Sequence, residues 1–151
     1  MWAPMSSLPA TATTRAPSDD ASYAGEEQIV AALASAGDRN AARARLAGFI
    51  ARHPTCAEAY NDLGVLAFEA GDLKAASSSI DQAIVLRPNI ARYHRNRALL
   101  MLNVGDTATG LAALARALIL DPTDAETLKL ITDVEAVRKK AARQGTKRGA
   151  H

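Results

Sequence analysis

The side chains of this chain best suited to metal binding or nucleophilic catalysis are three histidines and one cysteine. The histidines stand far apart, at His53, His94 and His151, and no two have the spacing of metal ligands. The single cysteine, Cys56, can form neither an intramolecular disulfide nor a cysteine-based metal site. We therefore expect no metal, no cofactor and no catalytic residue in this chain.

The sequence motifs of common enzyme classes are missing as well. The chain has no Walker A loop, no dinucleotide-binding glycine fingerprint, no HExxH zinc motif and no GxSxG nucleophile elbow. His94 is better explained by packing, and Cys56 by a small, half-buried apolar side chain at a junction of the fold. The sequence therefore predicts a protein that is not an enzyme.

Composition favours an all-helical fold. Hydrophobic residues make up 48% of the 151 residues, but only 4% are aromatic, and alanine is frequent in runs such as "IVAALASAG" and "GLAALARAL". Alanine has the highest helix propensity, and its small side chain lets helices approach closely. We expect a single all-α domain whose helices touch through small residues.

Charge and targeting signals point to a cytoplasmic protein. The formal net charge is only +2, and the basic C-terminal stretch "VRKKAARQGTKRGAH" has no aromatic residue to stack on bases, so no specific nucleic-acid site is expected. The opening stretch "MWAPMSSLPATATTRAPSDD" lacks the features of a secretory signal, and no apolar run approaches a membrane span. A lone cysteine fits a reducing compartment.

A repeat of 34 residues organises the middle of the chain. The pair Gly-Asp occurs at 37–38, 71–72 and 105–106, and 71 − 37 and 105 − 71 both give 34. Prolines follow the same period, at Pro54, Pro88 and Pro122. Glycine can adopt the left-handed conformation that ends a helix, the aspartate can cap the next helix, and proline stops that helix. Each period thus predicts a pair of helices joined at Gly-Asp.

These marks divide the chain into parts. Residues 1–22, rich in Ser, Thr, Ala and Pro, are expected to be a disordered or loosely ordered arm. Three repeats follow at 23–56, 57–90 and 91–124. Residues 125–143 have an apolar stripe and are expected to cap the last repeat, and 144–151 form a basic tail.

The second segment, "AEAYNDLGVLAFEAGDLKAASSSIDQAIVLRPN", resembles a tetratricopeptide repeat. Gly64, Ala76 and Ala83 stand where that pattern requires small residues. The third segment is similar, with His94 at the aromatic position, and the first departs most, with Phe49 at a small position. The resemblance implies an α-solenoid of stacked antiparallel helix pairs.

The resemblance also implies a concave groove lined by the first helix of each pair. It places ten residues on the surface expected to bind a partner: Asn61, Asp62, Val65, Phe68, Arg92, Arg95, Asn96, Leu99, Leu102 and Lys129. We expect the four apolar residues of this set to anchor a partner segment and the two arginines to face acidic groups on it.

One ligand known for the family, the carboxylate terminus of heat-shock chaperones, does not fit. Glu27 and Ala31 stand where that site needs a lysine and an asparagine, Asp62 replaces a second asparagine, and Asn96 replaces a cation. We instead expect an adaptor that binds a protein or peptide in its groove. The alternatives are a small chaperone for secreted or assembly-prone subunits, as some small bacterial three-repeat proteins are, and a regulatory partner of a separate enzyme. Exposed repeat edges also offer a surface for homo-oligomer formation.

Overall fold

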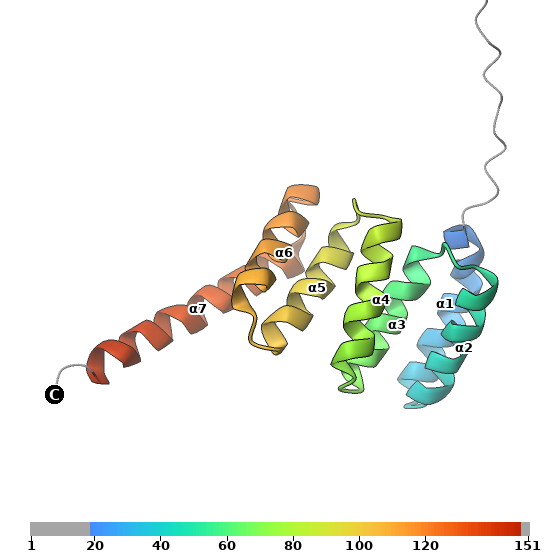
Figure 1. Cartoon of the computed structure of the whole chain (residues 1–151), viewed down its shortest axis with the longest axis horizontal. Helices are drawn as coiled ribbons and strands as arrows, with labels where there is room; N and C mark the ends of the chain where they lie inside the picture. The colour runs from blue at the N-terminus through green and yellow to red at the C-terminus, as the bar shows by residue number, and fades with distance from the viewer. Residues whose placement is uncertain (1–18, 149–151) are drawn as a thin grey trace, which may run out of the picture.

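The computed structural model describes residues 19–148, which fold entirely into helices and short connections (Figure 1). The predicted all-α solenoid is confirmed for these residues, which contain seven helices, two for each repeat and one after the last. The helices are α1 (Asp19–Ser35), α2 (Arg39–Arg52), α3 (Ala57–Glu69), α4 (Leu73–Leu86), α5 (Ala91–Asn103), α6 (Thr107–Leu120) and α7 (Ala125–Arg148). No helix in this part of the chain is both long and apolar enough to cross a membrane.

The three Gly-Asp turns behave as the sequence predicts. Gly37, Gly71 and Gly105 have φ angles of 85°, 78° and 86°, the left-handed region that suits glycine. Each following aspartate caps the second helix of its pair, with carboxylate-to-amide distances of 3.0, 3.1 and 3.1 Å. The second helices end at Arg52, Leu86 and Leu120, two residues before the periodic prolines.

Small residues bring the two helices of the second and third pairs into contact. A Cβ added at Gly64 would lie 2.6 Å from Cγ1 of Ile80 in α4, and one at Gly110 would lie 2.8 Å from Leu102 in α5. Ala83 of α4 and Ala117 of α6, which stand one repeat apart, have no exposed surface. Larger side chains at these positions would separate the helices, so the small residues determine how closely each pair packs.

The first pair packs less closely than the other two, and its sequence explains the difference. Phe49 occupies the position of Ala83 and Ala117, and Val30 that of Gly64. Both side chains are buried, and the Phe49 ring lies 4.4 Å from His53 and 5.2 Å from Tyr23 between centroids. The first repeat thus replaces a small-residue contact by an aromatic cluster, the departure that Phe49 predicted.

Helix α1 begins earlier than expected. The predicted arm at 1–22 overlaps α1, which starts at Asp19, and the rest of that arm, at 1–18, lies outside the described residues. The Asp19 carboxylate accepts hydrogen bonds from the backbone N–H and the hydroxyl of Thr55 and lies 3.2 Å from Nδ1 of His53. The Thr55 hydrogen bonds, followed by that of His53, lower the pKa of Asp19. This contact with the connection between α2 and α3 fixes a helix start that local sequence did not reveal.

Helix α7 continues beyond the expected end at residue 143, to Arg148, and so includes much of the predicted basic tail. A fourth Gly-Asp turn would fall at 105 + 34 = 139, where the chain has Lys139 and Lys140 instead. Lysine is a good helix former and disfavours the left-handed conformation, so the helix has no reason to end there.

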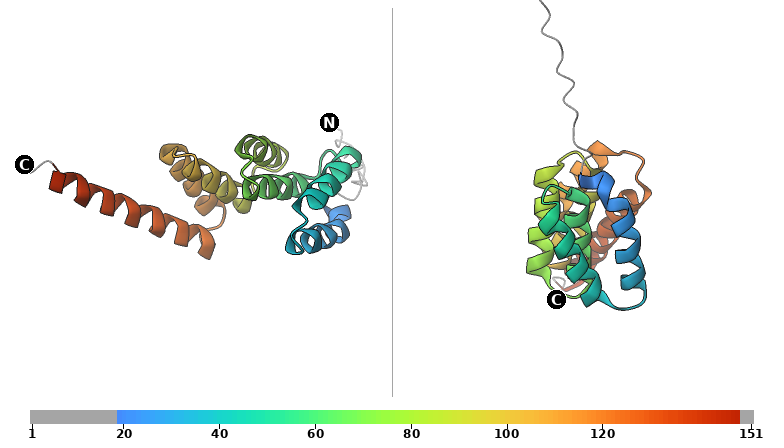
Figure 2. Two further views of the ribbon diagram at one scale, coloured as in Figure 1. Left: turned by 90° about the horizontal axis from the view of Figure 1, so that it is seen from below. Right: turned by 90° about the vertical axis from the view of Figure 1, so that its right-hand side faces the viewer.

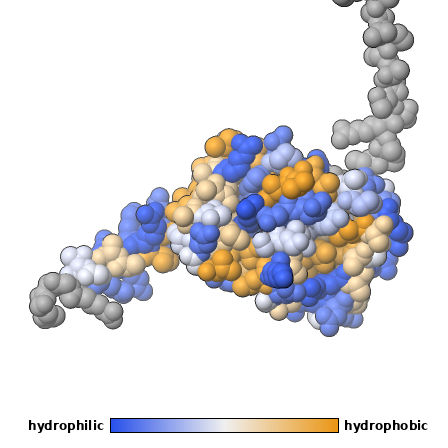
Figure 3. Space-filling view, viewed as in Figure 1, coloured by the Kyte–Doolittle hydropathy of each residue, from blue (hydrophilic) through white to orange (hydrophobic). Residues whose placement is uncertain are grey.

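The helices form two layers, one of first helices and one of second helices. In the view of Figure 1 the second helices α2, α4 and α6 lie toward the viewer, and apolar residues on their outer face form separate patches among hydrophilic ones (Figure 3). Helix α7 packs on the last pair through Leu130 and Ile131 and then extends away from the body with no other helix beside its C-terminal half (Figure 2).

Candidate interaction groove

A groove of about 300 Å³ lies between the first helices of the first two repeats. We refer to it as the α1–α3 groove. Its apolar lining consists of alanine, valine and leucine side chains, and carboxylates stand along it. Its lining residues are Glu27, Val30, Ala31, Ala34, Ser35, Asp62, Val65, Leu66 and Glu69.

The 34-residue repeat positions both walls of this groove. Subtracting 34 from Asn61, Val65, Phe68 and Glu69 gives 27, 31, 34 and 35, and all four of those α1 residues line the groove. Asp62 and Val65 are among the ten residues expected on the binding surface, whereas none of those ten comes from α1. The period alone could have found the α1 wall, because equivalent residues of stacked repeats share one face.

Asp62 is the most constrained carboxylate of the groove. It accepts a hydrogen bond of 2.8 Å from the hydroxyl of Tyr23, a residue that is 1% exposed in α1. Burial, and more weakly the charge of Glu27, raises the pKa of Asp62, while the hydrogen bond from Tyr23 opposes that rise. Burial likewise raises the pKa of the Tyr23 hydroxyl, which therefore stays a donor. The pair joins α1 to α3 beside the groove.

Asn61 and Asn96 join α3 to α5 in the same way. Asn61 is only 2% exposed, and its side-chain oxygen accepts a hydrogen bond of 2.7 Å from Nδ2 of Asn96. Its own Nδ2 donates to Asp62 at 3.2 Å. Burial therefore removes Asn61 from the surface expected to contact a partner, and its side chain holds neighbouring repeats together.

The two arginines expected to face a partner already have carboxylate partners within the chain. Arg92 pairs with Glu58 of α3. Arg95 lies 2.5 Å from Asp124 and 2.9 Å from Glu126, and its side chain is only 14% exposed. These cations link successive first helices, whereas Glu27 of α1 has no ion-pair partner among the described residues.

The remaining expected residues separate into core and surface. Phe68 packs on the cluster of Ala67, Ala76, Ile80 and Leu100, and Leu102 packs beside Ala98 and Leu114. Leu99 is 36% exposed. Lys129 is exposed and pairs with Asp133 of its own helix at 2.9 Å. Of the four apolar residues expected to anchor a partner, only Val65 lines the α1–α3 groove.

Three carboxylates gather at one end of the groove. Oxygen atoms of Glu27, Glu58 and Asp62 lie within 4.8 Å of one another. Glu58 is already paired with Arg92 and accepts a hydrogen bond from Tyr93, and Asp62 accepts one from Tyr23. Glu27 is exposed and has no ion-pair partner in the described chain. The arrangement gives the groove an acidic end whose outermost group is Glu27.

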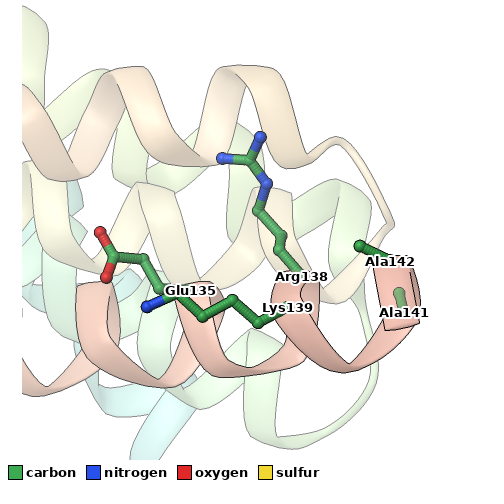
Figure 4. Close-up of a pocket in the computed structure, with 5 residues that line it drawn as sticks. All are labelled: Glu135, Arg138, Lys139, Ala141 and Ala142. Carbon is green, nitrogen blue, oxygen red and sulfur yellow. The ribbon is translucent and has the colours of Figure 1, made fainter. Parts of the chain in front are cut away.

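A second hollow, of about 620 Å³, lies along α7 and is lined by Glu135, Arg138, Lys139, Ala141 and Ala142. Figure 4 shows that all five residues come from this one helix, with the charged side chains extending from it. A hollow lined by a single helix has no opposing wall to hold a ligand, so we regard it as exposed helix surface.

A family model described as tetratricopeptide repeat matches residues 29–89 and 67–125 of the chain. Together these matches span all three expected repeats, apart from the start of the first. No match was found among the curated proteins.

Solved structures with the same fold come from proteins of different kinds. A mutant O-GlcNAc transferase of Thermobaculum terrenum is 26% identical with a TM-score of 0.66, over 72% of this chain and 21% of that one. This chain therefore spans about a fifth of that protein. MamA is 22% identical with a TM-score of 0.64, over 82% of this chain and 78% of that one.

The type III secretion chaperone SycD of Yersinia enterocolitica, solved with a peptide of the translocator YopD, is 17% identical. Its TM-score is 0.65, over 78% of this chain and 90% of that one. At this identity the likeness establishes a shared fold.

Proposed function

We propose that this chain, which belongs to the tetratricopeptide repeat family, is a non-catalytic interaction module that binds a segment of a partner protein in its α1–α3 groove. The proposed contact surface combines Ala31, Ala34 and Val65 as the apolar floor with Glu27 and Glu69 at the edges. A bound segment would bury the apolar floor, while the edge charges would select its sequence.

The observation that carries this proposal is that the expected groove residues near the C-terminal end are engaged in contacts between repeats, whereas those near the N-terminal end line a hollow. Toward the C-terminal end, Arg92, Arg95 and Asn96 are occupied by contacts with neighbouring repeats. Between α1 and α3, small side chains leave a hollow, and Glu27 remains without an ion pair among residues 19–148. A ligand there would displace water without breaking a contact that stabilises the fold.

The proposal is tested by filling the groove. Ala31 is exposed and lines the groove, so Ala31→Trp should occupy the hollow without disturbing the core. Partners captured from the native organism by the unaltered chain should be lost with this variant. Loss of a bound hot spot costs about 2 kcal/mol or more, which is on the order of 30-fold in affinity.

The matched control is Ala44→Trp, which adds the same bulk at an exposed position of α2 outside the groove. This variant should keep every partner. If Ala31→Trp retains its partners and its melting temperature is unchanged, the α1–α3 groove is not the binding site.

A dedicated chaperone is the second candidate function. Its support is the fold shared with SycD, which this chain matches over 90% of that protein's length. Under this alternative the groove would hold a segment of an assembly-prone subunit and keep it soluble. Co-expression distinguishes the two functions, because a chaperone raises the soluble yield of its client and an adaptor joins partners that are soluble alone. The absence of enzymatic activity and the cytoplasmic location stay predictions of the sequence.

A further inference from the structure

The first helices of the solenoid carry opposite charges at its two ends. Helices α1 and α3 contain seven carboxylates and no lysine or arginine: Asp19, Asp20, Glu26, Glu27, Glu58, Asp62 and Glu69. Helix α5 has three arginines and no carboxylate. From residue 136 to the end of α7 the sequence adds six cations and again no carboxylate: Arg138, Lys139, Lys140, Arg143, Lys147 and Arg148. One end of this layer is thus acidic and the other basic.

The basic end of α7 is amphipathic, and from residue 135 onward it is exposed wherever its side chains are described. Val134, Val137 and Ala141 stand at i, i+3 and i+7, so they share one face of α7. Val137 is 68% exposed, and Arg138 and Lys140 stand beside this apolar stripe. A helix end of about a dozen residues is marginally stable in water without tertiary contacts. This half of α7 therefore gains stability from any groove that accepts its apolar face.

The charges of this helix end also lack partners. Arg138, Lys139, Lys140 and Arg143 form no ion pair with a described carboxylate. The α1–α3 groove has the opposite imbalance, namely carboxylates without a cation. Glu27 forms no ion pair with a described residue, and Asp62 is hydrogen-bonded to a neutral hydroxyl. Burial, and more weakly the charge of Glu27, raises the pKa of Asp62, and a cation at the groove would offset that neighbouring charge.

We propose that the C-terminal half of α7 from one copy of the chain docks in the α1–α3 groove of a second copy. This inference rests on the proposed function, because it uses the same groove and names an occupant for it. The apolar stripe would lie on the floor formed by Ala31, Ala34 and Val65, with the cations of α7 near Glu27 and, at the other end, near Glu69, which Arg39 contacts at 3.4 Å. A helix lying in a groove with its apolar face inward is a common mode of peptide recognition.

The donor helix and the groove it fits cannot meet within one molecule. Helix α7 leaves the last repeat in the direction away from α1, and the two stand at opposite ends of the solenoid (Figure 1). The contact must therefore join two copies, and it uses two different surfaces. Such a head-to-tail contact leaves one groove and one helix unoccupied at the ends, so it can add further copies unless a ring closes.

The first measurement is the mass of the full chain in solution, by sedimentation velocity over a range of protein concentrations. We expect the mass to rise with concentration at about 50 mM salt and to return to that of a monomer near 1 M, where screening reaches about 3 Å. Charge reversal at either surface should abolish this rise in mass. Glu27→Lys reverses a charge of the groove, and the double variant Arg138→Glu with Lys140→Glu reverses charges of α7. Lys74→Glu, an exposed reversal on α4, should leave the rise intact.

The decisive test mixes the two reversed proteins. Each variant keeps one unaltered surface, so the native α7 of the Glu27→Lys protein can dock in the native groove of the other protein. The lysine at position 27 in turn faces the glutamates of the reversed α7. The mixture should therefore form a mixed complex although neither protein associates alone. A native chain that stays monomeric at low salt overturns the inference. So does a mass that rises equally in the reversed variants, which would place the contact elsewhere, for example on the exposed Val85 and Ile119 of α4 and α6.

A peptide of residues 134–148 separates this inference from the proposed function. Binding of the labelled peptide to the full chain, lost in Ala31→Trp, together with self-association supports both. Peptide binding by a chain that remains a monomer overturns the self-association and keeps the groove as a binding site. Self-association that persists in Ala31→Trp shows that α7 docks outside the groove. Binding of the peptide only to vesicles with anionic lipids would assign α7 to a membrane surface and overturn the inference.

Discussion

Asp62 shows how one residue can serve both the fold and the groove. Sequence position assigned it to the binding surface, and it does line the α1–α3 groove. Its carboxylate also accepts the Tyr23 hydroxyl at 2.8 Å and the Asn61 amide at 3.2 Å. A buried acceptor that keeps its charge needs such donors, because desolvation without them favours the protonated form. The geometry of the groove edge is therefore tied to the contact between α1 and α3.

Tyr23→Phe should lower stability by removing the donor to Asp62 and nothing else. The tyrosine ring stays packed on Phe49, so the expected loss is that of one hydrogen bond to a charged acceptor, about 1–2 kcal/mol. Urea denaturation followed by circular dichroism measures it. Tyr60→Phe is the matched control, because its hydroxyl bonds to no described residue, and it should be close to neutral. Equal losses in the two variants would show that Asp62 does not depend on Tyr23.

At the scale of a helix, glycine has two different roles in this chain. Gly71 ends α3 with φ at 78°, whereas Gly48 lies inside α2, where an added Cβ would meet nothing within 4 Å. The first position needs glycine for its backbone conformation. The second costs helix stability, because glycine loses more conformational freedom on folding than alanine does.

We therefore expect opposite effects from one substitution. Gly48→Ala should raise the free energy of unfolding by about 0.5–1 kcal/mol, through the higher helix propensity of alanine. Gly71→Ala should lower it by about 1–2 kcal/mol, the cost of the left-handed conformation for a residue with a Cβ. Thermal denaturation of both variants tests the pair. A stabilising Gly71→Ala would mean that the turn between α3 and α4 can adopt another backbone conformation.

At the scale of the whole molecule, α7 has two parts with different roles. Its first part covers the last repeat, where Thr127 is fully buried and Leu130 and Ile131 pack on the cluster of Ala98, Ala113 and Leu114. Its second part, from residue 135 onward, is exposed wherever its side chains are described. A stacked-repeat protein needs a cap on its terminal repeat, and only the first part supplies one.

Two truncations should separate these roles. A chain ending at residue 137 keeps the buried contacts of α7, so its melting temperature should stay close to that of the full chain while self-association is lost. A chain ending at residue 124 exposes the Ala98 cluster and should melt at a lower temperature or aggregate. Differential scanning calorimetry and sedimentation velocity measure the two effects. Equal melting temperatures for both chains would show that α7 does not cap the solenoid.

The sequence by itself determined the repeat, its turns and the pairing of helices. The reason is local: a left-handed glycine, a capping aspartate and a helix-ending proline each act within a few residues, and the 34-residue period multiplies their effect. The irregular first repeat was also predictable, because Phe49 is too large for a contact made by alanine in the other two repeats.

Tertiary structure alone decided which groove residues are available to a ligand. Asn61, Arg92 and Arg95 stand at groove positions in the sequence, yet Asn61 is buried and both arginines form ion pairs with residues about one repeat away. The start of α1 at Asp19 depends in the same way on Thr55, more than 30 residues distant. The position of a residue in its repeat predicts which face of the solenoid its side chain lies on. The residue that this side chain contacts comes from another part of the chain. Whether that partner is close enough to occupy the side chain is settled only when the helices stack.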